Sequence, residues 1–263
     1  MSALDDHALA ADLAERAGHL LLTLRAGGGG PDTLRKAGDR QSHEFLMAEL
    51  ARERPGDLVL SEEGIDDKAR LDADRVWIVD PLDGTNEFGE PGRSDWAVHA
   101  ALWARAAAAG TGDLIAGAVA LPAQNRVLST VAGPAPEPDG GAPDGGAEGP
   151  LRMVVSRTRA SALVKDVAKA LNAEMVPCGS AGAKVATVIT GENDVYLHSG
   201  GFYEWDTAAP AAVARQRGLH VSRIDGSPVV YNQKNPLLPD ILVCRPAIAP
   251  VLLHAIREAT HAI

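Results

Sequence analysis

The stretch that decides the fold is 76–88, which reads Val-Trp-Ile-Val-Asp-Pro-Leu-Asp-Gly-Thr-Asn-Glu-Phe. Its apolar, β-branched start at 76–79 predicts a strand that is buried on both faces. The strand is expected to end at Asp80, because Pro81 has no N–H group to donate to a sheet. A second carboxylate, Asp83, follows within one turn's length of chain. Two carboxylates this close repel each other unless a cation lies between them.

Gly84 and Thr85 come next and offer backbone amides at the start of an expected helix. Such amides bind phosphate oxygens, and hard cations such as Mg2+ bind one or two carboxylates together with a substrate phosphate. An ordinary strand-to-turn junction would use the same residues, since Asp-Pro and Asp-Gly are common in turns. Taken alone, the stretch leaves two alternatives open: a turn, or a site for metal and phosphate.

Composition limits the classes of protein that fit. The 263 residues can form one large domain or two small ones. The net charge is −10, with 35 acidic and 25 basic residues, and no block of Lys or Arg suggests a nucleic-acid-binding face. We therefore expect no nucleic-acid polymer as partner. A small anionic substrate would need local help from a metal or from basic side chains.

The cellular location is expected to be cytoplasmic. Cys178 and Cys244 are far apart and lack metal-ligand spacing, so they are interpreted as buried, reduced thiols. The first 24 residues carry several acids and do not resemble a signal peptide. No apolar run approaches the length of a membrane span, so no membrane contact is expected. The sequence does not determine the oligomeric state, and a homodimer is one open alternative.

The N-terminal part predicts helices followed by strands. Leucines at helical spacing indicate a helix over 9–24, which the glycines and proline of 27–31 end. The polar segment 32–39 is interpreted as a mobile loop, either filler or a lid over a site. Asp39 is then placed as the N-cap of a second helix. Strands are expected at 58–60, 76–79, 96–103, 114–121 and 126–131.

Residues 133–150 are almost entirely Gly, Pro, Ala, Asp and Glu, which predicts a disordered connector. This connector divides the chain into an N-terminal α+β metal-binding domain, 1–132, and a C-terminal α/β substrate domain, 151–263. Beyond it the pattern predicts strands at 152–155, 175–177, 194–197, 220–223 and 241–244, and helices at 160–171, 184–190, 207–217 and 247–262. Asp206 is expected to open its helix, with Pro210 in the first turn.

Carboxylates therefore end predicted elements at four places: Asp39, Glu62 with Glu63, Asp80 with Asp83, and Asp206. One acidic cap is usually only a cap, but the set suggests ligands gathered from different parts of the chain. Trp-Ile-Val-Asp-Pro-Leu-Asp-Gly-Thr at 77–85, Ser-Glu-Glu-Gly at 61–64 and Glu-Trp-Asp-Thr-Ala-Ala-Pro at 204–210 resemble the signature motifs of the inositol monophosphatase superfamily, the lithium-sensitive, Mg2+-dependent phosphatases.

Within that superfamily the chain is most similar to the CysQ-type 3'(2'),5'-bisphosphate nucleotidases. Four further stretches carry this likeness: Ala-Gly-Asp-Arg at 37–40, Leu-Ser-Glu-Glu at 60–63, Gly-Ser-Ala-Gly-Ala-Lys at 179–184 and Asp-Gly-Ser-Pro-Val-Val-Tyr-Asn at 225–232. The resemblance implies an α/β fold, a layered α-β-α-β-α sandwich of the sugar phosphatase and inositol monophosphatase type.

The resemblance also implies two or three Mg2+ ions. Glu62 would bind one ion together with Asp80 and the backbone carbonyl of Leu82. Asp80 would bridge to a second ion, which Asp83 and Asp206 also hold. Ions placed in this way can steady both the attacking and the leaving oxygen of an in-line displacement on phosphorus.

Further residues receive roles from the same resemblance. Thr85, hydrogen-bonded to Asp39, would orient and help deprotonate the attacking water. The amides of Gly84 and Thr85 would hold the transferred phosphate. Glu63 is the open alternative to its neighbour Glu62 as metal ligand, and Glu62 is favoured.

Substrate contacts are expected from the second domain, at Ser156, Arg159, Ser180, Lys184 and His198. Arg159 stands where many relatives have His, and His198 where relatives often have Arg, which leaves the geometry of a cationic patch open. Tyr196 and Tyr231 are candidate platforms for adenine.

The expected reaction is hydrolysis of 3'-phosphoadenosine 5'-phosphate to AMP and phosphate. An inositol-1-phosphate or fructose-1,6-bisphosphate phosphatase is the first alternative. A catalytically inactive sensor that binds nucleotide or phosphate is the second.

Overall fold

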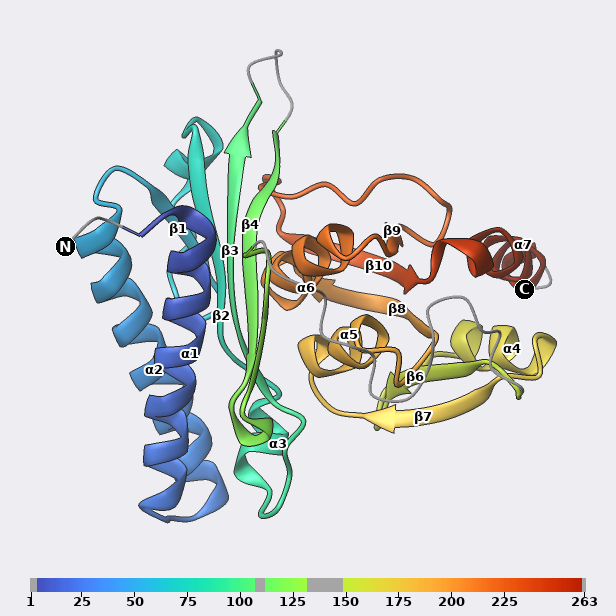
Figure 1. Cartoon of the computed structure of the whole chain (residues 1–263), viewed down its shortest axis with the longest axis horizontal. Coiled ribbons are helices and arrows are strands. Elements are labelled where there is room, and N and C mark those ends of the chain that lie inside the picture. Colours follow the sequence, from blue (N-terminus) through green and yellow to red (C-terminus); the bar gives the residue numbers. More distant parts are fainter. Residues whose placement is uncertain (1–3, 107–111, 132–148, 262–263) are drawn as a thin grey trace.

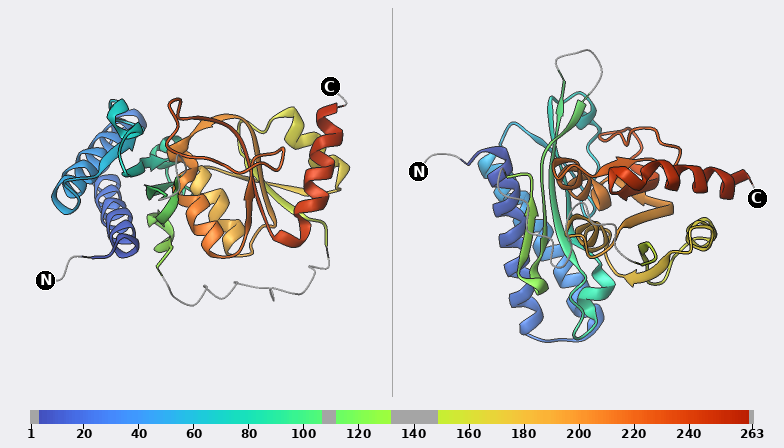
Figure 2. Two further views of the ribbon diagram at one scale, coloured as in Figure 1. Left: turned by 90° about the horizontal axis from the view of Figure 1, so that it is seen from above. Right: turned by 45° about the vertical axis from the view of Figure 1, so that its right-hand side comes forward.

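The computed structural model describes residues 4–106, 112–131 and 149–261. Its elements form five layers, a helix pair, a sheet, a second helix pair, a second sheet and a third helix pair, as Figure 1 and Figure 2 show. This α-β-α-β-α sandwich confirms the expected fold class. Within the described part of the chain, no helix is long and apolar enough to cross a membrane.

The first helix layer consists of α1 (Asp6–Ala26) and α2 (Pro31–Glu53). It covers a five-stranded sheet of order β1-β2-β3-β4-β5, whose strands are Leu58–Ser61, Arg75–Asp83, Ala97–Arg105, Gly112–Leu121 and Arg126–Ser129. The short helix α3 (Thr85–Gly89) follows β2 directly, and the 3-10 turns η1 (Lys68–Leu71) and η2 (Pro122–Gln124) join strands. Because β1 and β2 are parallel with Ser61 beside Val79, the next residues of the two strands, Glu62 and Asp80, are brought together.

The middle layer consists of α5 (Ala181–Ile189) and α6 (Glu204–Gln216). It lies between the first sheet and a second sheet of order β7-β6-β8-β10-β9, whose strands are Glu174–Cys178, Arg152–Ser156, Val195–Tyr203, Leu237–Cys244 and His220–Ser222. The third helix layer, α4 (Ala162–Ala170) and α7 (Ala249–His261), covers the other face of this sheet, with the 3-10 turn η3 (Pro246–Ile248) before α7. Gly117 of β4 lets α6 approach closely, since a Cβ there would lie 2.8 Å from Ala212 Cβ.

The segment 32–39 is not a loop, and that prediction was wrong. Helix α2 begins at Pro31, where the missing N–H costs nothing because the first helical N–H groups have no partner in the helix. Its buried stripe runs every four residues through Leu34, Gly38, Ser42, Leu46 and Leu50. Two members of the stripe are not apolar, so the hydrophobic pattern was hidden. Gly38 is required by packing, since a Cβ would lie 2.8 Å from Leu82.

Two expected boundaries are also corrected. Strand β2 does not end at Asp80 but continues to Asp83, with an irregularity in its pairing with β3 between these residues that accommodates Pro81. Helix α6 begins at Glu204, so Asp206 is its third residue and Pro210 lies inside the helix rather than in its first turn. Pro210 therefore leaves the carbonyl of Asp206 without the usual helical donor.

Cys178 and Cys244 are both free thiols, as expected, but only Cys244 is buried, whereas Cys178 is half-buried. The predicted connector, 133–150, lies outside the described residues except for its last two positions. The domain boundary it was assigned stays a prediction, although all strands of the first sheet precede it and all strands of the second sheet follow it.

Candidate active site

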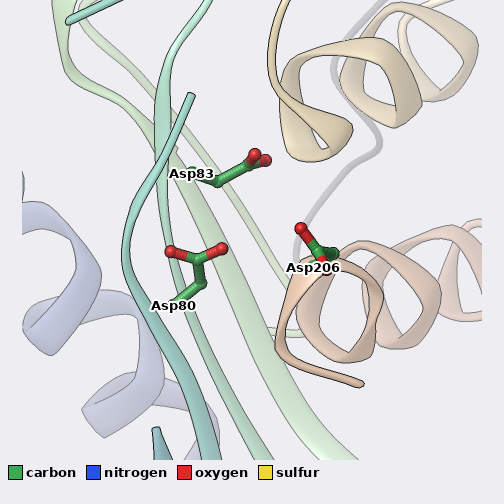
Figure 3. Close-up of side chains that lie close together, drawn as sticks. All are labelled: Asp80, Asp83 and Asp206. Atoms are coloured by element: carbon green, nitrogen blue, oxygen red, sulfur yellow. The ribbon is translucent and has the colours of Figure 1, made fainter. Parts of the chain in front are cut away.

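Three carboxylates face one another between the first sheet and α6. Asp80 and Asp83 come from the end of β2, and Asp206 comes from the first turn of α6 (Figure 3). One oxygen from each lies within 4.8 Å of one oxygen from both others. Asp80 and Asp83 are only 1% and 7% exposed. So much negative charge with so little water is unfavourable unless a cation shares the space.

Asp83 is held by the start of α5. Its Oδ2 accepts hydrogen bonds from Ser180 Oγ at 2.6 Å and from the Gly182 amide at 2.7 Å. His99 Nε2 lies 3.2 Å from the same oxygen. Burial alone would raise the pKa of Asp83, but these partners, with nearby Lys184, lower it to about 2. The carboxylate is thus kept ionised, with Oδ1 available to a cation.

The other two carboxylates are each fixed by a backbone amide. Asp80 Oδ1 accepts from the Leu82 amide at 3.0 Å, and Asp206 Oδ2 accepts from the Tyr203 amide at 2.6 Å. Burial, followed by repulsion from neighbouring carboxylates, raises the pKa of Asp80 well above its usual range and that of Asp206 to about 6. Removing this repulsion is what a bound divalent cation would do.

Glu62 completes the acidic group from the end of β1. The residue as a whole is exposed because it lines the open cavity. Its carboxylate, however, is surrounded by protein atoms that limit its contact with water. Burial of the carboxylate raises the pKa of Glu62 to about 7, with repulsion from Asp206 adding to it. Glu63, the open alternative, repels both Asp39 and Glu62, but it is not part of the cavity wall to which Glu62 belongs. This difference favours Glu62 over Glu63 as the ligand.

The residues present fit a hard divalent cation. Every donor is an oxygen, and Asp80 and Asp83 are almost fully buried. Burial, followed by repulsion from neighbouring carboxylates, raises the pKa values of Glu62 and Asp206. Leu82 lies on the wall of the same cavity, and its backbone carbonyl accepts a hydrogen bond from Thr85 Oγ1 at 3.1 Å. The structure thus places all five predicted metal ligands on the wall of one cavity and brings oxygens of three of them, Asp80, Asp83 and Asp206, within 4.8 Å of one another. Their role in binding Mg2+ stays a prediction.

Thr85 and Asp39 form the predicted pair. Thr85 Oγ1 lies 3.2 Å from Asp39 Oδ1, which joins α3 to the middle of α2. Burial and then repulsion by Glu63 raise the pKa of Asp39 to about 6, against the opposing effect of the Thr85 hydrogen bond. Asp39 is therefore ionised near neutral pH but close enough to its pKa to take up a proton.

Gly84, between β2 and α3, has a φ of 87°, which only glycine adopts without strain. A Cβ there would also lie 3.1 Å from Ser180 Cβ and 3.3 Å from the Asp95 carbonyl. The tight turn places Gly84 and Thr85 on the wall of the same cavity. Phosphate binding by their amides stays a prediction.

The cavity has a volume of about 340 Å³, and its wall includes every predicted substrate-binding residue: Gly84, Thr85, Ser156, Arg159, Ser180, Lys184 and His198. Two of them, Lys184 and Ser180, already make hydrogen bonds within the protein. Lys184 is 6% exposed, and its Nζ donates to the carbonyls of Gly179 and Ser180 at 2.8 and 2.6 Å. Ser180 Oγ donates to Asp83 and accepts from the Ala183 amide. Both therefore shape the loop before α5 as well as lining the cavity.

Arg159 and His198 differ in charge. Arg159 is exposed, and its backbone amide donates to Ser156 Oγ at 3.1 Å, which fixes the loop but leaves the guanidinium at the cavity. Burial, with Lys184 nearby, lowers the pKa of His198 to about 4, so this ring is neutral at neutral pH. It packs against Phe202, with 4.6 Å between ring centroids. Of these two residues, Arg159 and not His198 brings positive charge to the cavity at neutral pH. Binding of a second phosphate stays a prediction.

The two candidate platforms for adenine lie differently. Tyr196 lines the cavity but is only 1% exposed, whereas Tyr231, which is 3% exposed, belongs to the core between the sheets and is not part of the cavity wall. The accessible ring is Tyr203, which is 45% exposed, lines the cavity and stacks on Trp205 with 4.7 Å between centroids. Sequence reasoning missed it because β8 was expected to end at residue 197, whereas it continues to Tyr203.

The chain belongs to the inositol monophosphatase family, whose model matches residues 7–261. This family is the class that the layered fold and the acidic site define. A protein of Mycobacterium tuberculosis (strain CDC 1551 / Oshkosh) named 3'-phosphoadenosine 5'-phosphate phosphatase is 52% identical over 248 residues, 92% of this chain and 90% of the relative. The 3'(2'),5'-bisphosphate nucleotidase CysQ of Escherichia coli (strain K12) is 32% identical over 207 residues, 77% of this chain and 81% of the relative.

Solved structures agree. The crystal structure of CysQ from Bacteroides thetaiotaomicron, a bacterial member of the inositol monophosphatase family, matches with a TM-score of 0.74 and 30% identity, covering 90% of this chain and 96% of that one. The resemblance inferred from the motifs is therefore confirmed.

Proposed function

We propose that the protein is an Mg2+-dependent phosphatase that hydrolyses the 3'-phosphate of 3'-phosphoadenosine 5'-phosphate, giving AMP and inorganic phosphate. The observation that carries the proposal is that the acidic cluster of Asp80, Asp83 and Asp206 lines one cavity with Thr85, whose hydroxyl contacts Asp39. A relative 52% identical over most of the chain carries the name of this activity. We propose that the reaction takes place in the cytoplasm, where it would remove 3'-phosphoadenosine 5'-phosphate, a by-product of sulfate assimilation.

The metal ligands would be the carboxylates of Glu62, Asp80, Asp83 and Asp206 and the carbonyl oxygen of Leu82, for two or three Mg2+ ions. Bound there, the ions supply positive charge that stabilises the transferred phosphoryl group and the leaving oxygen. The protein's part is to keep these oxygens in place. Three of the carboxylates are each held through one oxygen by a donor of the protein, which leaves the other free.

Thr85 and Asp39 would act on the attacking water. The Thr85 hydroxyl orients the water while Asp39, ionised above about pH 6, draws the proton through the hydroxyl. The water oxygen forms the new bond to phosphorus as the bond from phosphorus to the ribose 3' oxygen breaks. The ribose 3' oxygen leaves as the 3'-hydroxyl of AMP once it gains a proton from solvent.

The substrate would lie along the rest of the cavity. The amides of Gly84 and Thr85 would face the transferred phosphate, and Arg159 at the cavity wall would pair with the second phosphate. Ser156, Ser180, Lys184 and His198 would complete the wall. Tyr203 is the ring with enough exposed surface to support a base.

The test is phosphate release with Mg2+ from 3'-phosphoadenosine 5'-phosphate, inositol-1-phosphate and fructose-1,6-bisphosphate, compared side by side by kcat/KM. The wild-type protein should favour the nucleotide, and an Asp83→Asn variant should be inactive on all three. A clear preference for either sugar-type phosphate would keep the metal site and overturn the substrate. No release from any of the three would favour a sensor that binds phosphate without hydrolysis.

A further inference from the structure

A buried histidine on β3 lies behind the acidic cluster. His99 is 0% exposed and stands opposite Asp80 in the register of β2 and β3. Its Nδ1 lies 3.0 Å from the backbone carbonyl of Trp205. A carbonyl oxygen can only accept, so Nδ1 carries a proton and is the donor.

The other ring nitrogen faces a metal ligand. His99 Nε2 lies 3.2 Å from Asp83 Oδ2, a charge-contact distance, although the ring is not aligned as in a good hydrogen bond. Oδ2 accepts hydrogen bonds from Ser180 and Gly182, and the His99 ring packs against the same oxygen, so the oxygen is enclosed on the side away from the cavity. This enclosure fixes which oxygen of Asp83 remains for a cation.

The same ring therefore contacts both elements that supply the cluster. Trp205 immediately precedes Asp206, so a bond to its carbonyl fixes the peptide plane from which that ligand projects. Asp83 belongs to β2 in the first sheet. His99 spans the boundary between the sheet and α6 at the point where the ligands meet.

Helix α5 is built to leave room for the ring. A Cβ on Gly182 would lie 2.1 Å from His99 Nε2, so any larger residue there would displace the imidazole. The amide of the same Gly182 donates to Asp83 Oδ2. Three elements, β2, α5 and α6, thus meet at one side chain.

We propose that His99 is a positioning residue that couples Asp83 to Asp206 and thereby sets the affinity of the acidic site for divalent cations. The inference rests on the proposed metal site. It goes further by assigning a role to a side chain outside the ligand set, in a strand from which no site residue was predicted. Groups that orient metal ligands in this way usually change metal affinity by about 10- to 100-fold when removed.

The test compares His99→Leu with Val98→Ala. Val98 is the neighbouring residue of β3, 0% exposed, and faces the helix layer of α1 and α2 instead of the site. Both variants lose core packing, but only His99→Leu loses the contacts to Asp83 and Trp205. Mg2+ binding to each intact protein is measured by titration calorimetry, together with the melting temperature at several Mg2+ concentrations.

We expect the Mg2+ dissociation constant to rise about tenfold or more in His99→Leu and to stay unchanged in Val98→Ala. His99→Asn, which keeps a donor near the Trp205 carbonyl, should recover part of the loss. Gly182→Ala, which displaces the ring without altering it, should weaken Mg2+ binding as His99→Leu does. The Mg2+ concentration that gives half-maximal activity should shift in parallel, while KM for the nucleotide does not.

Equal Mg2+ affinity in His99→Leu and Val98→Ala would overturn the proposal and leave His99 as a packing residue. If His99→Leu does not fold, His99→Asn and Gly182→Ala decide the question by the same measurement. Failure of the proposed metal site would look different, because the wild-type protein itself would then bind no Mg2+. Failure of the proposed substrate would leave Mg2+ affinity unchanged and would appear only in the comparison of the three phosphate esters.

Discussion

The hydroxyl of Thr85 lies 3.2 Å from the carboxylate of Asp39, so that the first residue of α3 meets the middle of α2. Thr85 Oγ1 is also 3.1 Å from the Leu82 carbonyl, and one hydroxyl proton can serve only one of these acceptors. When Asp39 is ionised it is the stronger acceptor. The direction of the hydroxyl therefore depends on the carboxylate beside it.

Thr85→Ala tests this pair. Losing the hydroxyl should lower kcat by about 100-fold or more, in the range of general acid–base contributions, while Mg2+ affinity changes little. Steady-state kinetics on 3'-phosphoadenosine 5'-phosphate give the number. Thr23→Ala is the matched control, because Thr23 is exposed on α1 and donates only to the His19 carbonyl. Wild-type kcat in Thr85→Ala would exclude the hydroxyl from the reaction.

Asp83→Asn should fold but bind Mg2+ poorly. The Gly182 amide can only donate, so the amide oxygen of the new side chain must face it, which puts the NH2 group where Oδ1 stood. An NH2 group cannot ligate a cation. Mg2+ affinity measured by calorimetry should therefore fall by more than about 100-fold, beyond the loss typical of supporting groups. Asp113→Asn, at an exposed carboxylate, should bind as the wild type does. Turnover retained by Asp83→Asn at saturating Mg2+ would refute the metal assignment.

The stability of the metal-free protein should fall as the pH rises. The pKa values of Asp39, Glu62 and Asp206 in the folded protein, about 6 to 7, exceed their ordinary values of 3.8 to 4.5. The folded state therefore binds more protons than the unfolded state between about pH 4 and pH 7, and the stabilisation is lost as the pH rises through the folded-state values. Asp83, whose pKa is lowered, acts in the opposite direction only below about pH 4.

Mg2+ should reverse this trend, because it binds the deprotonated carboxylates. Melting temperatures measured with and without Mg2+ at about pH 5.5, 6.5 and 7.5 should show a metal-free value that declines and an increment from Mg2+ that grows. An Mg2+ increment independent of pH would show that Glu62 and Asp206 do not bind the ion.

Arg70→Leu should destabilise the protein. Arg70 is 0% exposed and donates to Asp66, Asn232 and the Gln233 carbonyl, which ties the loop after β1 to the segment before β10. Removing one partner of a buried charge pair costs about 3 to 5 kcal/mol, and urea unfolding should show a loss of this size. Arg52→Leu, at an exposed pair with Glu49, should change the free energy of unfolding by less than about 1 kcal/mol. Equal effects of the two variants would contradict the assignment.

Substitution of Arg159 should affect substrate binding, whereas substitution of Lys184 should affect the stability of the fold. Arg159→Ala should raise KM for the bisphosphate nucleotide about tenfold, as expected for loss of a charged hydrogen bond, with an unchanged melting temperature. Lys184→Met should lower the melting temperature, since two buried carbonyls lose their donor. Thermal unfolding and steady-state kinetics, measured on both variants, distinguish the two effects. An unchanged KM in Arg159→Ala would remove it from the substrate site.

Much of the site could be predicted from sequence because its ligands lie in short, contiguous motifs. Asp80 and Asp83 are fixed by one strand, and parallel pairing of β1 with β2 brings Glu62 to them. The strands of both sheets were identified from apolar runs. The segment 32–39 could not be predicted from such a pattern, because α2 buries Gly38 and Ser42 where a helix usually buries apolar residues.

The residues that position the predicted metal ligands could not be predicted from the sequence. His99, and the dual use of Ser180 and Lys184, depend on the way α5 and α6 pack against the first sheet, which no local pattern records. Ser180 also has a φ of 37°, an unfavourable conformation for a residue with a side chain. Its bond to Asp83 and its cap on α5 stabilise that conformation.

The division of the ligands along the chain has a practical consequence. Glu62, Asp80 and Asp83 precede the stretch 132–148, and Asp206 follows it. Two separate polypeptides, 1–131 and 149–263, would each carry an incomplete ligand set. Phosphate release from such a mixture would report their reassociation, which makes the enzyme a candidate for a split reporter.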